Sequence, residues 1–156
     1  MQVKISSIFP IKPELAWQEV QKTKLLHYVG SPLIKFIPAR ETPFTELWQT
    51  GEYIVDMKLF GLLPFGKQII GIKPPPEHEQ KQHQFSILDD GRGELIKTWR
   101  HLITVDKVNA EKTLYADEVE VQAGVLTFFV WLFANIFFWH RQRRWKKLIR
   151  NNFNYQ

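Results

Sequence analysis

The most constraining feature of the sequence is a long apolar stretch near its end, AGVLTFFVWLFANIFFWHRQRRWKKLIR, which covers residues 123–150. Within Val125–Trp139 only Thr127 and Asn135 are polar. A helix of that apolar length rises about 22 Å, whereas the hydrocarbon core of a bilayer is about 30 Å thick. The stretch is therefore predicted to be the long closing helix of a globular fold and not a membrane span.

The predicted helix changes character along its length. One stripe at helical spacing is apolar throughout and should face the protein: Trp131, Ala134, Phe138, Trp145, Leu148 and Ile149. The opposite side is basic in the second half and apolar in the first: Arg143, Lys147 and Arg150, then Val125, Phe129, Leu132 and Ile136. The first half therefore needs a second cover. The short N-terminal helices, a second copy of the chain in a homodimer and a lipid-like membrane surface are the alternatives.

The net charge of +5 is local. Six of the 21 basic residues lie in the segment 141–150, and without them 15 basic residues stand against 16 acidic ones. A nearly neutral body argues against nucleic-acid binding, which needs a wider basic surface. The basic helix end serves either as a solvated end that complements the helix dipole or as a contact with anionic lipid.

The sequence lacks the residue types or spacings that disulfides, thiolate catalysis and metal binding require. The chain has no cysteine, which excludes disulfides and thiolate catalysis and suits the cytoplasm, and its opening residues are too polar for a secretory signal. His78 and His83 lie five residues apart among glutamates, without a recognised metal-ligand spacing. We therefore expect no metal and no other cofactor.

The rest of the chain reads as one α+β domain over residues 1–156. QVKISSIF alternates like a strand, and PIKPELAWQEVQK and KLLHYVGSP read as short helices. About six more strands follow, with PPPEHEQKQ as a polar loop and DDGR before Gly93 as a hairpin turn. Strands in succession indicate an antiparallel sheet that curls, and only the last helix could cover its concave face.

This order resembles the helix-grip fold of the START/Bet v 1-like (SRPBCC) superfamily over essentially the whole chain. The resemblance is carried by SIFPIKPELAWQEV, by IKTWRHLITV and by LYADEVEVQAGVLTFFVWLFANIFFWHRQRRWKKL, which look like bacterial ligand-binding members. It implies a cavity between the sheet and the last helix for a small hydrophobic or lipid-like molecule. The superfamily also contains polyketide cyclases, aromatases and hydrolase-like members, so the fold does not choose between carrier and enzyme.

Strand parity selects the residues expected to face this cavity. In TLYADEVEVQA the more apolar parity carries Tyr115 and Asp117 inward and leaves Glu118 and Glu120 in solvent. The expected ligand-binding residues are Tyr53, Trp99, His101, Tyr115, Asp117, Phe129 and Phe133. The helix pattern could also place Phe129 and Phe133 outside. A membrane or partner surface is expected at Val125, Leu132, Ile136, Arg143, Lys147 and Arg150.

His101 and Asp117 are the only candidates for proton transfer, as the alternative cyclase- or dehydratase-like enzyme would need. Each also has a purely structural interpretation. His101 could be a hydrogen-bonded core residue, and Asp117 could be paired with a basic neighbour such as Arg100. The sequence alone leaves open whether the chain is an enzyme.

Overall fold

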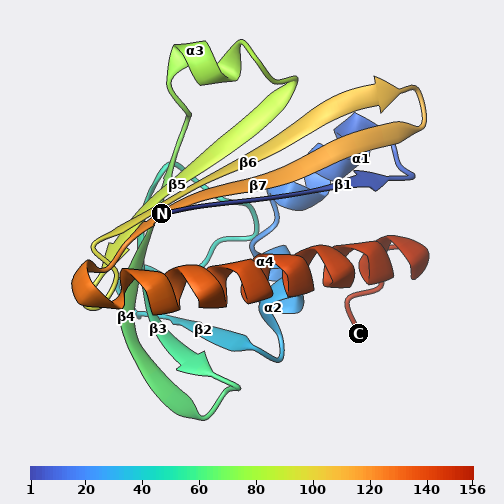
Figure 1. The fold of residues 1–156 in the computed structure, drawn as a ribbon. Helices are drawn as coiled ribbons and strands as arrows, with labels where there is room; N and C mark the ends of the chain where they lie inside the picture. The colour runs from blue at the N-terminus through green and yellow to red at the C-terminus, as the bar shows by residue number, and fades with distance from the viewer.

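The computed structural model describes residues 1–156 and contains one antiparallel sheet of seven strands. The strands lie in the order β1-β7-β6-β5-β4-β3-β2 and curve around the long helix α4 (Figure 1). The strands are β1 Gln2–Phe9, β2 Ile34–Pro38, β3 Gly51–Leu59, β4 Leu63–Lys73, β5 Phe85–Gly93, β6 Thr98–Asn109 and β7 Lys112–Gln122. The helices are α1 Pro13–Val20, α2 Thr23–Gly30, α3 Glu77–Gln80, the 3-10 turn η1 Gly124–Leu126 and α4 Thr127–Arg150.

The arrangement confirms the predicted helix-grip α+β fold. Helix α1 begins at Pro13, where a missing N–H costs nothing, and α2 ends at Gly30 before Pro32. Strand β7 alternates as predicted: Tyr115 and Asp117 are fully buried, whereas Glu118 is partly exposed. The inner face of the sheet, which α4 packs against (Figure 1), therefore carries the buried parity of β7.

The DDGR hairpin prediction is wrong. Strand β5 runs through this segment to Gly93, and the connection to β6 follows at residues 94–97. The glycines serve close strand approach instead of a turn: a Cβ on Gly71 of β4 would lie 2.6 Å from the Asp90 carbonyl oxygen, and one on Gly91 would lie 2.8 Å from the Ile69 carbonyl oxygen. The predicted loop PPPEHEQKQ also contains a single helical turn, α3.

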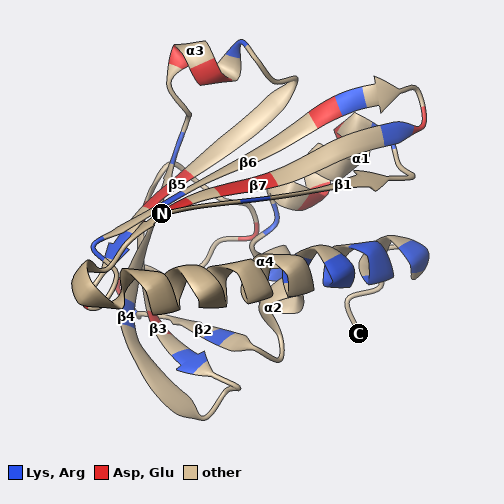
Figure 2. Ribbon diagram, in the orientation of Figure 1, with Lys and Arg blue, Asp and Glu red and all other residues tan.

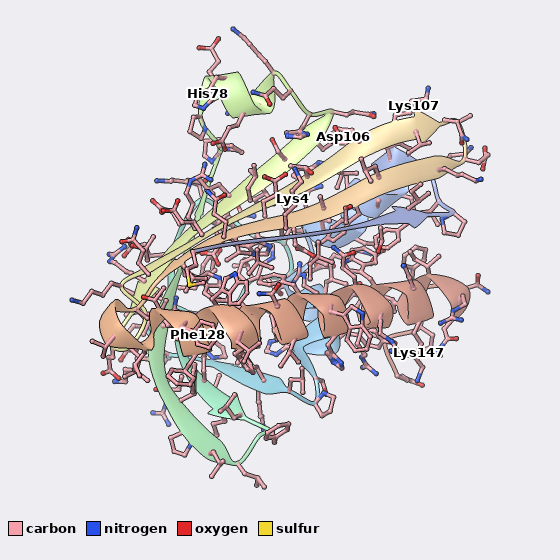
Figure 3. The ribbon with its side chains drawn as sticks, viewed as in Figure 1. Lys4, His78, Asp106, Lys107, Phe128 and Lys147 are labelled. Carbon is pink, nitrogen blue, oxygen red and sulfur yellow. The ribbon has the colours of Figure 1, made fainter.

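Two apolar clusters meet along α4. One joins the second half of α4 to β1, β7, α1 and α2 through fully buried side chains, namely Phe9, Val29, Tyr115, Trp145 and Leu148. The other joins the first half of α4 to β2, β3 and β4, and includes Phe36, Val55, Ile70, Phe137 and Phe138. Figure 3 shows side chains filling the space between α4 and the sheet.

Most of the predicted inward stripe of α4 is confirmed, because Ala134, Phe138, Trp145, Leu148 and Ile149 are buried. With η1, the segment Gly124–Arg150 is long and apolar enough to cross a membrane by length and composition. Its buried residues recur on successive turns from Val130 to Ile149, so the helix packs on the sheet along most of its length. Of its most apolar 18-residue window, 28% is buried.

Candidate ligand-binding site

An apolar cavity lies between the first half of α4 and the concave face of the sheet. It encloses about 70 Å³. Side chains from β2, β3, β4, β6, α2 and α4 form its wall, and among them are Phe36, Met57, Phe65, Trp99, Phe133 and Phe138. A second space of about 50 Å³ adjoins it under α2 and shares Leu26, Ile70, Asp89, His101 and Arg141 with the first. The two adjoining spaces together are called the chamber, and the shared residues Asp89, His101 and Arg141 form its polar end.

The polar end is built on Asp117, whose carboxylate is fully enclosed behind the cavity wall. Its Oδ1 lies 3.3 Å from Nε of Arg141 and accepts hydrogen bonds from the Tyr115 hydroxyl and from Nε2 of His101, each at 2.9 Å. Its Oδ2 accepts one from Gln142 at 3.1 Å. A buried carboxylate with four polar partners is a rigid centre that fixes the side chains around it.

The protonation states in this cluster follow from burial and charge. Burial alone would raise the pKa of Asp117, but Arg141, His101 and Gln142 together hold it below its usual value. Burial lowers the pKa of His101 and outweighs the attraction of the Asp117 carboxylate. Asp117 is therefore ionised and His101 is neutral. Since Asp117 can only accept, His101 carries its proton on Nε2 and keeps Nδ1 as an acceptor.

Asp89 on β5 completes the polar end from the neighbouring strand, where it pairs with His101. Its Oδ1 accepts the backbone N–H of Gly71 at 2.8 Å, at a gap in the β4–β5 ladder. Asp89 is partly exposed and lines both spaces, and protein packs around its carboxyl group. Burial therefore raises the pKa of Asp89 to about 7.

Three polar atoms of the cluster have no hydrogen-bond partner in the protein: Nη1 of Arg141, Nδ1 of His101 and Oδ2 of Asp89. The only fully enclosed polar side-chain atom without a partner is Nε1 of Trp145. The three atoms therefore border accessible space, and the cavity is the space that all three residues line. The chamber thus offers one donor, one acceptor and a carboxyl group at its polar end.

The structure divides the expected ligand-binding residues into three groups. Trp99, His101 and Phe133 line the cavity. Tyr115 and Asp117 lie directly behind it, and Tyr53 is buried with its hydroxyl bonded to the backbone of Gln49. Phe129 lies outside the wall with 66% of its side chain exposed, because it is on the opposite side of α4 from the sheet.

Sequence reasoning missed Asp89 and Arg141. Asp89 belonged to the supposed turn, and Arg141 was counted in the basic run, although it is only 4% exposed. The expected partner of Asp117 is also different: Arg100 pairs with Glu79 of α3 at 2.6 Å, and Arg141 takes its place. One signal could have identified Arg141, since it is four residues before Trp145 on the inward stripe.

The expected surface on α4 is exposed in this chain. Val125 is 97% exposed, and Phe129, Leu132 and Ile136 are about half exposed or more. Arg143, Lys147 and Arg150 are exposed on the same side. Figure 2 shows α4 without charge in its first half and with a run of basic residues in its second half. The short N-terminal helices therefore do not cover the apolar half.

No group of three or more His, Asp or Glu side chains has a geometry that could hold a metal ion. The histidines of the polar loop have other neighbours. His83 contacts the Asp106 carboxylate through Nδ1 at 2.7 Å, and His78 lies 3.8 Å from Glu79.

No family model matches the sequence, and no curated protein matches it. Solved structures match in fold. A START superfamily protein from Mycobacterium smegmatis is 15% identical, with a TM-score of 0.68 over 96% of this chain and 97% of that one. A protein from Thermus thermophilus is 7% identical, with a TM-score of 0.63 over 99% of this chain and 100% of that one.

The Aha1 dimer from Colwellia psychrerythraea has a subunit that is 8% identical, with a TM-score of 0.61 over 95% of both chains. Identities this low indicate a shared fold and nothing finer. The chain therefore has the helix-grip fold of the START/Bet v 1-like (SRPBCC) superfamily, as its sequence resemblance predicted.

Proposed function

We propose that this protein binds a small hydrophobic molecule between the sheet and α4. One observation carries the proposal: an apolar chamber is closed at one end by a buried polar cluster that leaves unpaired donor and acceptor atoms facing inward. Apolar burial would supply most of the binding free energy, and the polar cluster would orient the ligand. Residues 1–156 would act as one ligand-binding domain.

The charges of the cluster favour a neutral polar group on the ligand. Arg141 is already balanced by Asp117, and Asp89 with a pKa of about 7 is partly protonated near neutral pH. A carboxylate ligand would meet these two acids with a single cation. A hydroxyl or carbonyl group could instead accept from Nη1 of Arg141, and a hydroxyl could also donate to Nδ1 of His101. The proposed ligand is therefore an apolar chain or ring system with a hydroxyl or carbonyl at one end.

The chamber must widen to hold such a ligand. Typical ligand pockets enclose about 300–1,000 Å³, far more than the 70 Å³ of this cavity. Aromatic side chains occupy much of the wall, and the Phe65–Phe133 pair, with ring centroids 6.1 Å apart, joins β4 to α4. Both rings are partly exposed, so they can change rotamer at lower cost than the buried Phe138.

The first test is native mass spectrometry on protein purified from cells without detergent, which should detect a hydrophobic adduct on the folded monomer. A titration with straight-chain alcohols, followed by the intrinsic tryptophan fluorescence to which Trp99 of the cavity wall contributes, then measures the chamber. Each added CH₂ should tighten binding about fourfold until the chamber is full, and the matching fatty acids should bind more weakly.

A matched pair of variants decides whether the chamber is the binding site. Leu26→Trp fills the space shared by both cavities and should abolish binding. Val108→Trp adds the same ring on the exposed β6–β7 hairpin and should change nothing. Equal affinity in the two variants, or no affinity for any alcohol in the native protein, would contradict the proposal.

Catalysis in the same chamber is a second candidate, favoured by the His101–Asp117 pair. A neutral imidazole that lines the cavity and is oriented by an ionised carboxylate has the arrangement of a general base. Incubating the captured ligand with fresh protein should then change its mass, and His101→Ala should stop the change while binding persists. An unchanged mass with the native protein would leave the carrier function alone.

The proposed compartment is the cytoplasm. A chain without cysteine gains nothing from an oxidising compartment. The cytoplasmic face of a membrane is also where anionic lipids concentrate, which suits the basic end of α4.

A further inference from the structure

One side of η1 and α4 together presents an exposed stripe that begins in η1 and continues to the end of α4. Its members recur at intervals of three and four residues: Val125, Phe129, Leu132, Ile136, Trp139, Arg143, Lys147 and Arg150. The first five are apolar and the last three are basic. Because this spacing follows one face of a helix, all eight side chains can contact the same flat surface at once.

The charge pattern selects the partner of this stripe. Helix α4 contains no Asp or Glu, and Arg143 also lies over the Trp139 ring at 4.5 Å, at the point where the apolar part meets the basic part. A second copy of the stripe would bring like charges together in a parallel pairing and would set basic side chains against apolar ones in an antiparallel pairing. An anionic lipid surface satisfies both parts, with hydrocarbon for the first and headgroups for the second.

The β3–β4 hairpin adds a second apolar element beside the stripe. Its tip exposes Phe60, Leu62 and Leu63, of which Leu62 is 80% exposed. Phe60 has a φ of 51°, in the left-handed region that bulky side chains rarely adopt. The hairpin projects beyond α4 on the side away from β1 and β7 (Figure 1). A strained, exposed aromatic residue at a loop tip gains nothing in water.

The hairpin and the stripe are neighbours. The ring of Phe65, two residues after Leu63, contacts the ring of Phe133, one residue after Leu132, in a tilted arrangement. This contact also belongs to the cavity wall. A pair of partly buried rings in the chamber wall therefore joins the strand that follows the hairpin tip to the first half of α4.

We infer that this protein docks on anionic membranes through the α4 stripe and the β3–β4 hairpin tip. The apolar residues enter the acyl boundary, and Arg143, Lys147 and Arg150 contact the headgroups. In this orientation the Phe65–Phe133 contact opens toward the bilayer, which gives a lipid-derived ligand a dry route into the chamber. The route rests on the proposed ligand-binding function, whereas the docking surface does not.

Co-sedimentation with vesicles tests the docking. The protein should pellet with phosphatidylcholine vesicles that contain phosphatidylglycerol and much less with phosphatidylcholine alone. Replacing Arg143, Lys147 and Arg150 by Gln should weaken binding to the anionic vesicles about 100-fold at low salt. Phe129→Ser with Leu62→Ser should weaken it at least about tenfold. All five residues are exposed, so the variants should keep the stability of the native protein.

Matched controls carry the same changes elsewhere. Lys12, Lys107 and Lys112, all exposed, replaced by Gln remove three charges near the β6–β7 hairpin end, and Figure 3 places Lys107 well apart from Lys147. Ile8→Ser with Val108→Ser removes two exposed apolar side chains away from α4. Both controls should pellet like the native protein.

Two results would overturn the docking proposal. One is pelleting that falls equally in the control and the stripe variants, since net charge or hydrophobicity alone would then explain it. The other is a stable dimer in solution that buries Phe129 and does not pellet, because a second copy would then occupy the stripe. Leu26→Trp separates the two proposals: it should lose the ligand and still bind vesicles.

Discussion

The two halves of α4 use large apolar side chains differently: the second half buries them, and the first half also exposes them. The second half is a solid core: Trp145 and Leu148 are fully buried against Phe9 and Tyr115, and basic residues cover the outside. The first half is apolar on both sides, with a cavity behind it and a bare stripe in front. The polar cluster around Asp117 lies between them. Both halves pack on an apolar cluster, but only the first half combines its buried side with a cavity and an exposed apolar side, which suits it to binding.

Truncation of Trp145 should cause the largest loss in the free energy of unfolding. Trp145→Ala leaves a large cavity in the solid core and should lower the free energy of unfolding by about 4 kcal/mol. Phe129→Ala, on the exposed side of the first half, should change it by less than about 0.5 kcal/mol. Chemical denaturation measures both. Similar losses at the two sites would mean that the halves are equally structural.

Removal of Arg141 should come next. Arg141→Met leaves the Asp117 carboxylate buried without its cation and should cost about 3 kcal/mol at neutral pH. The native pKa of Asp117 lies below its unfolded value of about 3.9, so native stability from this pair is complete above about pH 4 and is lost as pH falls further. The variant should lose part of its deficit in acid, where Asp117 becomes protonated. A deficit independent of pH would contradict the ion-pair account.

Truncation of the cavity wall should have a smaller effect on stability. Phe133→Ala removes one ring of the Phe65–Phe133 pair and should lower the free energy of unfolding by about 2 kcal/mol, because the ring is partly exposed. It should also speed ligand binding, measured by stopped-flow fluorescence. A slower association rate would mean that the pair guides the ligand and does not obstruct it.

The smallest expected effect is at Asp89. Its folded pKa of about 7 lies above its unfolded value, so its contribution is complete below about pH 4 and is lost as pH rises through about 7. Asp89→Asn keeps an oxygen to accept the Gly71 N–H and removes the titration. Between about pH 5 and about pH 8 the variant should gain about 1–2 kcal/mol of stability relative to the native protein, by thermal melting.

The fold followed from the sequence because alternation and helical spacing report directly which side of an element is buried. The inward parity of β7 and the exposed side of Arg143 on α4 came from that rule, whereas Phe129, expected in the ligand-binding set, lies on the exposed side that the helix pattern also allowed. The site did not follow so well. Asp89 and Arg141 meet only because β5 pairs with β6 and α4 crosses both, and no local pattern encodes that meeting. Glycines that normally indicate a turn here permit two strands to approach closely.

The Phe65–Phe133 contact has a consequence for kinetics. A ligand that passes this pair of rings while the stripe lies on a bilayer never enters bulk water. Its transfer between membranes should then become faster with the concentration of acceptor vesicles and should show little dependence on its own aqueous solubility. Collision of the protein with the membrane would be the rate-limiting step of ligand transfer. Salt would lower the transfer rate, because it weakens the attraction between the basic residues and the anionic headgroups.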